Sequence, residues 1–246
     1  RVTRLSNLFD NSIYSQNYFG RLYEKNKSIG SSVFQNYIFS LSLVLKKIGI
    51  NINTVPVLDL LHQNKHKIIG DRSFSSNPYI VSNLGEICVQ NYKKNKIGTI
   101  IKHIPGHGRS NSDSHYKLPV IKEKLQILKK TDFKCFKNNK SFFAMTAHIL
   151  YKKLDKKNCA THSKKIINQI IRKEIGFKGI LISDDISMKA LKRDIYKNAL
   201  LSLNAGCNLV LYCSGKVSEN NKLLKIMPYI DEFTKKKTSE FYKFLS

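Results

Sequence analysis

The chain has 246 residues, 41% of them hydrophobic, with a formal net charge of +26 at pH 7, which is enough apolar content for one large domain with a core. No run of about 18 apolar residues occurs and no apolar signal-peptide core follows Arg1, so we expect no membrane span. The five cysteines are odd in number and form no CxxC pair, which indicates reduced thiols in an intracellular protein.

Five apolar runs predict strands, and stretches of helical periodicity lie between them. The expected strands are 50–58, 97–104, 141–149, 179–183 and 208–213. The expected helices are 32–48, 84–96, 122–138, 163–175 and 188–204, with 234–237 in a terminal helix. This alternation is typical of a parallel α/β fold. Polar or reactive residues follow each strand, which favours a TIM (β/α)8-type barrel with its active site on that face.

The strand count does not reach the eight that such a barrel needs. At about 30 residues per β/α unit, roughly 60 to 90 residues would have to precede the first expected strands. We therefore expect 1–246 to form a single barrel domain that lacks its first three strands. An open sheet of five strands would expose strand edges and apolar surface.

The segment 102–119, KHIPGHGRSNSDSHYKLP, is rich in reactive side chains. Regular helix is excluded because Pro105 has no backbone N–H and Gly106 and Gly108 favour open conformations. Reactive side chains on a loop indicate a functional site, since loops carry function on a rigid scaffold.

Within this loop, Asp113 and His115 are two positions apart, so the carboxylate can reach an imidazole nitrogen in a turn. Such a pair fixes the ring tautomer and stabilises the imidazolium, which makes a general acid/base near neutral pH. Two alternatives stay open: a zinc site, and histidines that are only solvated. The i, i+4 geometry of zinc helices is not available to His103 and His107 across Ile104-Pro105-Gly106, so we expect no metal.

A second signal lies downstream, where an apolar run ends in Ser183-Asp184-Asp185. Carboxylates at the end of a buried strand are costly unless they are used or paired. Neighbouring side chains on a strand point to opposite faces, so one aspartate faces the barrel and the other should bond the following turn. The alternative, that both begin the next helix, accounts for Asp185 but explains Asp184 poorly.

Three further residues have two interpretations each. Arg72 either pairs with its neighbour Asp71 or clamps a polar or anionic substrate group. Asp59 either binds ligand or orders a neighbouring arginine, and we favour the structural role. His148 is equally compatible with an active-site wall and with a satisfied core histidine.

The charge of +26 also has two explanations. A strong positive field attracts phosphates, which favours nucleic-acid binding. The alternative is compositional drift, because Lys, Asn and Ile recur throughout the chain as an AT-rich coding sequence would produce. The lysines are spread along the chain and no familiar nucleic-acid motif occurs, so we expect no dedicated nucleic-acid partner.

Together these pieces resemble glycoside hydrolase family 3, specifically its bacterial β-N-acetylglucosaminidases of cell-wall recycling. The matching stretches come in the family's order and span almost the whole chain: RVTRL, PVLDL, IGDRSF, KHIPGHGRSNSDSHYKLP, MTAH, GFKGILISDDISM and NAGCNLVLYC. The Asp-Ser-His triplet separates this branch from the β-glucosidases of the family. In the family, RVTRL follows a strand with a sugar-binding aspartate, and this chain begins just after it.

The resemblance implies a retaining hydrolase of the cytoplasm that releases terminal β-linked N-acetylglucosamine from muropeptides. It implies that Asp184 is the nucleophile and that His115, assisted by Asp113, is the acid/base. The implied sugar-binding residues are Arg4, Arg72, Lys102 and His103. We expect a monomer without cofactors. Two alternatives stay open: a truncated, non-catalytic relative that binds sugar or a protein partner, and a basic nucleic-acid-binding protein.

Overall fold

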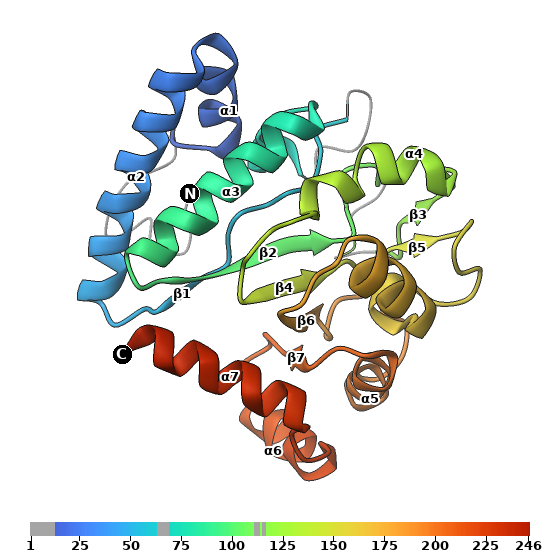
Figure 1. Ribbon diagram of the computed structural model, residues 1–246. Coiled ribbons are helices and arrows are strands. Elements are labelled where there is room, and N and C mark those ends of the chain that lie inside the picture. Colours follow the sequence, from blue (N-terminus) through green and yellow to red (C-terminus); the bar gives the residue numbers. More distant parts are fainter. Residues whose placement is uncertain (1–12, 63–68, 111–113, 115–116) are drawn as a thin grey trace.

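The computed structural model describes residues 13–62, 69–110, 114 and 117–246 (Figure 1). Its main sheet has five parallel strands in the order β1-β2-β4-β6-β7. Their bounds are β1 Ile52–Asn53, β2 Gly98–Ile104, β4 Phe143–Thr146, β6 Ile180–Asp185 and β7 Leu209–Leu211. Each lies within or overlaps an expected strand, so all five are confirmed. A smaller parallel pair is formed by β3 (Val120–Ile121) and β5 (Leu150–Tyr151).

Helices connect the strands and follow the last one. The α-helices are α1 Gln16–Lys25, α2 Lys27–Lys47, α3 Pro78–Lys94, α4 Leu125–Lys130, α5 Ile195–Ala205, α6 Val217–Ile226 and α7 Glu232–Leu245. The shorter or wider helices are η2 Gly70–Arg72, η3 Phe133–Phe136, η4 Ala160–His162 and the π-helix η5 Ile166–Glu174. The expected terminal helix is confirmed as α7.

Each expected helix overlaps an observed one, although α2 and α3 begin earlier than expected and the expected helix 163–175 is the π-helix η5. The other two predictions differ as follows. The expected helix 122–138 is interrupted at Thr131 and becomes α4 and η3. The expected helix 188–204 begins later, as α5, because Asp194 Oδ1 accepts the backbone N–H of Lys197 at 2.9 Å and caps the helix there.

Side chains alternate between the two faces of the sheet, as the two-residue period of a strand requires. Ile101, Ala144 and Leu181 belong to the large core that α2 and α3 share. The opposite face packs against α7, where Ile100 and Phe143 contact the cluster around Phe241. Figure 1 shows α3 and α7 on opposite sides of the sheet. Both faces are therefore covered, which explains why the strands are nearly continuous apolar runs.

The architecture is an α/β fold with a curled parallel sheet that forms a half-barrel, and β1 and β7 are its edges in the described part of the chain. This arrangement is consistent with a TIM-type fold, while the closed eight-stranded barrel stays a prediction. Beyond β1, Val57 forms an isolated bridge with Lys102, and the Gln16 side-chain amide pairs with its other side by donating to Val57 O at 2.8 Å and accepting from Val57 N at 2.9 Å.

One helix of the described residues, α2, is long and apolar enough to cross a membrane by length and composition alone. Its inner side chains Phe34, Ile38 and Leu45 are buried in the main core, where α2 packs against α1 and α3. Core helices of this kind pass the same test, so the expected absence of a membrane span stays a prediction.

Candidate active site at the carboxyl ends of the strands

The structure brings the expected site residues of the described chain to one edge of the sheet. Lys102 and His103 lie at the carboxyl end of β2, Asp184 near the end of β6, and Arg72 at the end of η2. The expected residues Arg4, Asp113 and His115 lie outside the described residues. Carboxyl ends of parallel strands are where α/β folds place their binding sites.

Lys102 and Asp184 lie close enough to interact electrostatically. Lys102 shares the strand parity of Ile100, which packs on the α7 side, whereas Asp184 lies where the register of β6 with β7 shifts. Burial lowers the pKa of Lys102 more than Asp184 and Asp59 raise it, and the positive charge of Arg72 lowers it further. The ammonium, the guanidinium and the two carboxylates therefore lie within electrostatic reach of one another.

Asp184 is held in its ionised form. Burial alone would raise its pKa, but His103, His148 and Lys102 together lower it below the usual value. The backbone N–H of Asp185 contributes by donating to Asp184 Oδ1 at 2.8 Å. A carboxylate of this kind can act as a nucleophile at neutral pH.

Asp185 has a different role from its neighbour. Its carboxylate accepts the backbone N–H of Ser187 at 3.0 Å, the Ser187 hydroxyl at 2.7 Å and the backbone N–H of Cys213 at 3.2 Å. It therefore ties the turn after β6 to the end of β7. The expectation that one aspartate of the pair bonds the following turn is confirmed.

Asp59 anchors the first part of the segment 102–119, called the histidine loop below. It is completely buried, and its Oδ2 lies 2.7 Å from His103 Nδ1. Its oxygens also accept the backbone N–H of His103 at 3.2 and 3.3 Å and that of His107 at 2.6 Å. Burial raises the pKa of Asp59, but the attraction and hydrogen bonds of the two histidines outweigh it and lower the pKa. The structural role is supported, and the partners seen among the described residues are two histidines.

The charge of Asp59 also decides the protonation of His103. An ionised carboxylate only accepts hydrogen bonds, so His103 Nδ1 must carry a proton. In the neutral ring, Nε2 is then an acceptor. This orientation is what a ring needs if it is to receive a hydrogen bond from a ligand hydroxyl.

His107 and Ser114 connect the histidine loop to the segment after β6. His107 Nε2 lies 3.3 Å from Ser114 Oγ, and Ser114 O accepts the backbone N–H of Ala190 at 3.1 Å. Burial, followed by repulsion from His103, lowers the pKa of His107 to about 4, so its ring is neutral at neutral pH. Ser114, which lies between Asp113 and His115 in the sequence, is therefore held by one contact to His107 and one to Ala190.

His148 is a satisfied core histidine. It is fully buried, and its Nε2 donates to Asp185 O at 3.0 Å, since a carbonyl oxygen only accepts. Its Nδ1 lies 2.8 Å from the Thr161 hydroxyl oxygen, whose proton is donated to Ala147 O at 3.1 Å. Thr161 was missed by the sequence analysis, because nothing in its local pattern marks it as a partner of a histidine on another strand end.

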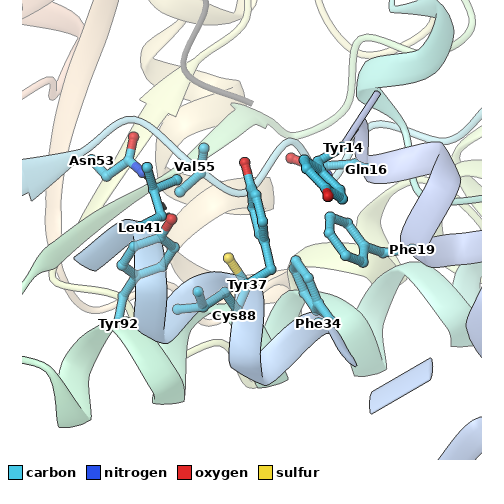
Figure 2. Close-up of a pocket in the computed structure, with 11 residues that line it drawn as sticks. Tyr14, Gln16, Phe19, Phe34, Tyr37, Leu41, Asn53, Val55, Cys88 and Tyr92 are labelled. Atoms are coloured by element: carbon cyan, nitrogen blue, oxygen red, sulfur yellow. Dashed lines mark hydrogen bonds between the residues drawn. The ribbon is translucent and has the colours of Figure 1, made fainter. Parts of the chain in front are cut away.

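A separate hollow lies on the helix side of the sheet and is lined by aromatic rings (Figure 2). The centroid of the Phe19 ring lies 4.6 Å from that of Phe34 and 4.9 Å from that of Tyr37. Of the expected site residues, those that the structure describes do not line this hollow. We interpret it as packing between α1, α2 and α3.

Within the described residues, no group of three or more His, Cys, Asp or Glu side chains could hold a metal ion. The His103 and His107 rings lie with centroids 5.5 Å apart, and the Nδ1 of His103 is occupied by Asp59. The expected absence of a metal stays a prediction, because two of the candidate ligands, Asp113 and His115, lie outside the described residues.

Comparison with known families gives one match over most of the chain: the family model described as the glycosyl hydrolase family 3 N terminal domain matches residues 41–237. A beta-hexosaminidase of Methylobacillus flagellatus is 30% identical over 201 residues, which cover 80% of this chain and 57% of that relative. A beta-hexosaminidase of Neisseria meningitidis serogroup A is 33% identical over 206 residues, which cover 81% of this chain and 56% of that relative. The chain thus spans less than two thirds of the length of these relatives.

Solved structures agree with this match. NagZ from Neisseria gonorrhoeae, in complex with N-trifluoroacetyl-D-glucosamine, has a TM-score of 0.83 at 28% identity, and the match covers 94% of this chain and 67% of that one. The β-N-acetylglucosaminidase from Thermotoga maritima has a TM-score of 0.72 at 29% identity, with coverage of 91% and 49%.

Proposed function

Because this chain belongs to glycosyl hydrolase family 3 through its N-terminal domain, we propose that it provides the catalytic core of a β-N-acetylglucosaminidase. The names of its relatives, beta-hexosaminidase and NagZ, support an enzyme that acts on N-acetylglucosamine-containing substrates. In this proposal 1–246 is a single catalytic barrel-type domain that hydrolyses terminal β-linked N-acetylglucosamine with retention of configuration.

Asp184 is the proposed nucleophile, and its environment is the observation that carries the proposal. Retention by double displacement needs a carboxylate that attacks the anomeric carbon and forms a glycosyl-enzyme. Asp184 lies at the carboxyl end of β6, within electrostatic reach of Lys102, with its pKa held low against burial by His103, His148 and Lys102. An anionic carboxylate facing this edge is what the first step requires.

His115, assisted by Asp113, is the proposed acid/base. The usual proton donor of a retaining glycosidase is a second carboxylic acid, and a His–Asp pair would replace it here. In the first step the imidazolium protonates the leaving oxygen, and in the second the neutral ring takes a proton from water. The support is the neighbouring Ser114, which His107 and Ala190 hold in place beside the end of β6.

The proposed sugar-binding residues are Arg4, Arg72, Lys102 and His103. A cation such as Lys102 donates to hydroxyl oxygens of a sugar, and the acceptor Nε2 of His103 receives a hydroxyl proton. Because Lys102 and Asp184 attract each other electrostatically, a sugar bound by Lys102 would lie near the nucleophile.

We further propose the biological setting that the family branch suggests. The substrate would be a muropeptide fragment in peptidoglycan recycling, hydrolysed in the cytoplasm by a monomer without cofactors. The high positive charge would then be compositional and would serve no dedicated nucleic-acid partner.

The test is release of nitrophenol from 4-nitrophenyl N-acetyl-β-glucosaminide by the full-length protein. Asp184→Asn should abolish turnover, because an amide cannot form the glycosyl-enzyme. Asp185→Asn is the matched control, with the same chemical change one residue along, and should retain far more activity. Trapping with a 5-fluoro glycosyl fluoride should label the peptide of β6 at Asp184.

Near-normal rates in Asp184→Asn, or a label on Asp185, would contradict the assignment. Sugar binding without turnover by a folded full-length protein would favour the non-catalytic relative instead.

A further inference from the structure

Asp132 is a buried carboxylate that does not cap the helix it precedes. It precedes η3, where an aspartate commonly caps the helix, yet its side chain makes no capping hydrogen bond. The side chain is only 1% exposed. A buried charge is costly unless it is paired, so the partners of Asp132 indicate its role.

Its main partner belongs to the histidine loop. Arg109 Nε donates to Asp132 Oδ2 at 2.6 Å, and Arg109 Nη2 donates to the Thr131 hydroxyl at 3.1 Å. The same guanidinium lies 3.6 Å from Glu123 Oε1. Asp132 also contacts the loop at Gly106, where an added Cβ would come within 2.9 Å of Asp132 Cβ.

A second segment faces the other oxygen of the same carboxylate. His62 Nε2 lies 3.5 Å from Asp132 Oδ1, and neither atom has another hydrogen-bond partner among the described residues. His62 follows β1 on the path to Arg72, and Arg109 follows β2 on the path to His115. One buried carboxylate therefore binds Arg109 and lies beside His62, on two segments that lead to different proposed site residues.

We infer that Asp132 is a positioning residue for the proposed acid/base, acting through Arg109. The inference rests on the proposed function, since it assigns the anchor of the loop that carries His115. Asp59 fixes the start of this loop at His103 and His107, and Asp132 fixes it further along at Arg109. The two carboxylates thus hold His103, His107 and Arg109, which precede Ser114 in the loop.

The kinetic test compares two leaving groups. From a 2,4-dinitrophenyl glycoside, dinitrophenolate departs as a stable anion and needs little acid assistance. From a phenyl glycoside, the leaving phenolate oxygen must be protonated by the acid/base. Asp132→Asn should lower kcat/KM at least about tenfold for the phenyl glycoside and less than about threefold for the dinitrophenyl glycoside. Arg109→Gln should behave alike, and the double variant should be no worse than either single variant.

Glu174→Gln is the matched control. Glu174 pairs with Lys129 of α4 at 2.5 Å and with Lys137 beside η3 at 2.7 Å, so it braces the same elements without touching the loop. Its kcat/KM should stay near the wild-type value for both glycosides. An equal loss on both glycosides in Asp132→Asn, or the same pattern in Glu174→Gln, would overturn the inference.

A readout that needs no turnover separates this inference from the proposed function. Hydrogen exchange of the peptide 103–117 should accelerate in Asp132→Asn and remain unchanged in Glu174→Gln. Unchanged exchange in Asp132→Asn would overturn the anchor even if the enzyme is active. A full-length protein that hydrolyses neither glycoside but shows the faster exchange would refute the proposed function and keep the anchor.

Discussion

Replacing Asp59 by asparagine removes a buried charge while keeping the size of the side chain. The carboxylate of Asp59 accepts from His103 Nδ1 at 2.7 Å, from the His107 N–H at 2.6 Å and from the His103 N–H at 3.2 Å. An asparagine oxygen in the Oδ1 position can still accept from the backbone N–H groups of His107 and His103. Its NH₂ group, in the Oδ2 position, then faces His103 Nδ1, so the ring must change tautomer.

The magnitude follows from these contacts. A hydrogen bond to a charged group contributes about 1.5–3 kcal/mol and a neutral one about 0.5–1.5 kcal/mol, so the loss of the charge from three bonds should cost roughly 3–4 kcal/mol. For a chain of this size, each kcal/mol lowers the unfolding midpoint by about 2–4 °C. The reversed tautomer makes His103 Nε2 a donor, which should reduce kcat/KM by roughly 10- to 100-fold if a sugar hydroxyl donates to it.

Thermal unfolding and initial rates measure both effects. Asp155→Asn is the control: Asp155 accepts from Ser163 Oγ at 2.7 Å and from two loop N–H groups, but it is largely solvated and remote from the site. It should shift the midpoint much less and leave kcat/KM unchanged. An Asp59→Asn variant whose midpoint and kcat/KM both match the wild type would refute the reasoning.

The sign of the pH dependence is also fixed. The pKa of Asp59 is lower in the folded state than its ordinary value of 3.8, so its stabilisation is present above that value. It is lost as the pH falls through the lowered pKa. The difference in stability between wild type and Asp59→Asn should therefore shrink below about pH 4.

Two further predictions concern stability away from the proposed chemistry. Burial lowers the pKa of His162 to about 4, so the stability of the protein should fall as the pH drops from 6.5 toward 4. In urea titrations, His162→Gln should remove up to about 3 kcal/mol of this pH dependence, and a profile like that of the wild type would contradict the prediction. Gly98→Ala would place a Cβ 2.6 Å from the Phe241 ring and should cost about 1–3 kcal/mol of stability. Gly49→Ala would lose stability through backbone strain alone, because its φ is positive and no atom lies within 4 Å of the added Cβ. Near-ultraviolet circular dichroism, which reports the packing of aromatic rings such as Phe241, should change in Gly98→Ala and not in Gly49→Ala.

The local pattern of the sequence was enough for the strands and for the residues at their ends. Apolar runs bounded by polar residues predicted five strands, because a strand buried on both faces must be apolar along its length. The two-residue period of a strand separated Asp184 from Asp185 and predicted that one of them bonds the turn. The motifs in order along the chain then indicated the family, which the comparison confirms.

Helix bounds were less well predicted, because side chains such as Asp194 compete for the backbone N–H groups at which a helix begins. The cap of Asp194 moved the start of α5, and the break at Thr131 divided one expected helix into two. Periodicity reports which residues favour a helix, but not where a side chain competes for the first N–H groups.

Only the tertiary structure decided which distant residues share the site. Asp59 and His103 are 44 positions apart, and Arg109 and Asp132 are 23 apart, so their pairing depends on the register of β1 with β2 and on the packing of α4 and η3. The sequence does not indicate that these residues pair with one another. The local pattern of the sequence predicts each strand and the polar residues at its end, because secondary structure depends on neighbours along the chain. A buried charge must have a partner, and only the fold decides which residue lies close enough to pair with it.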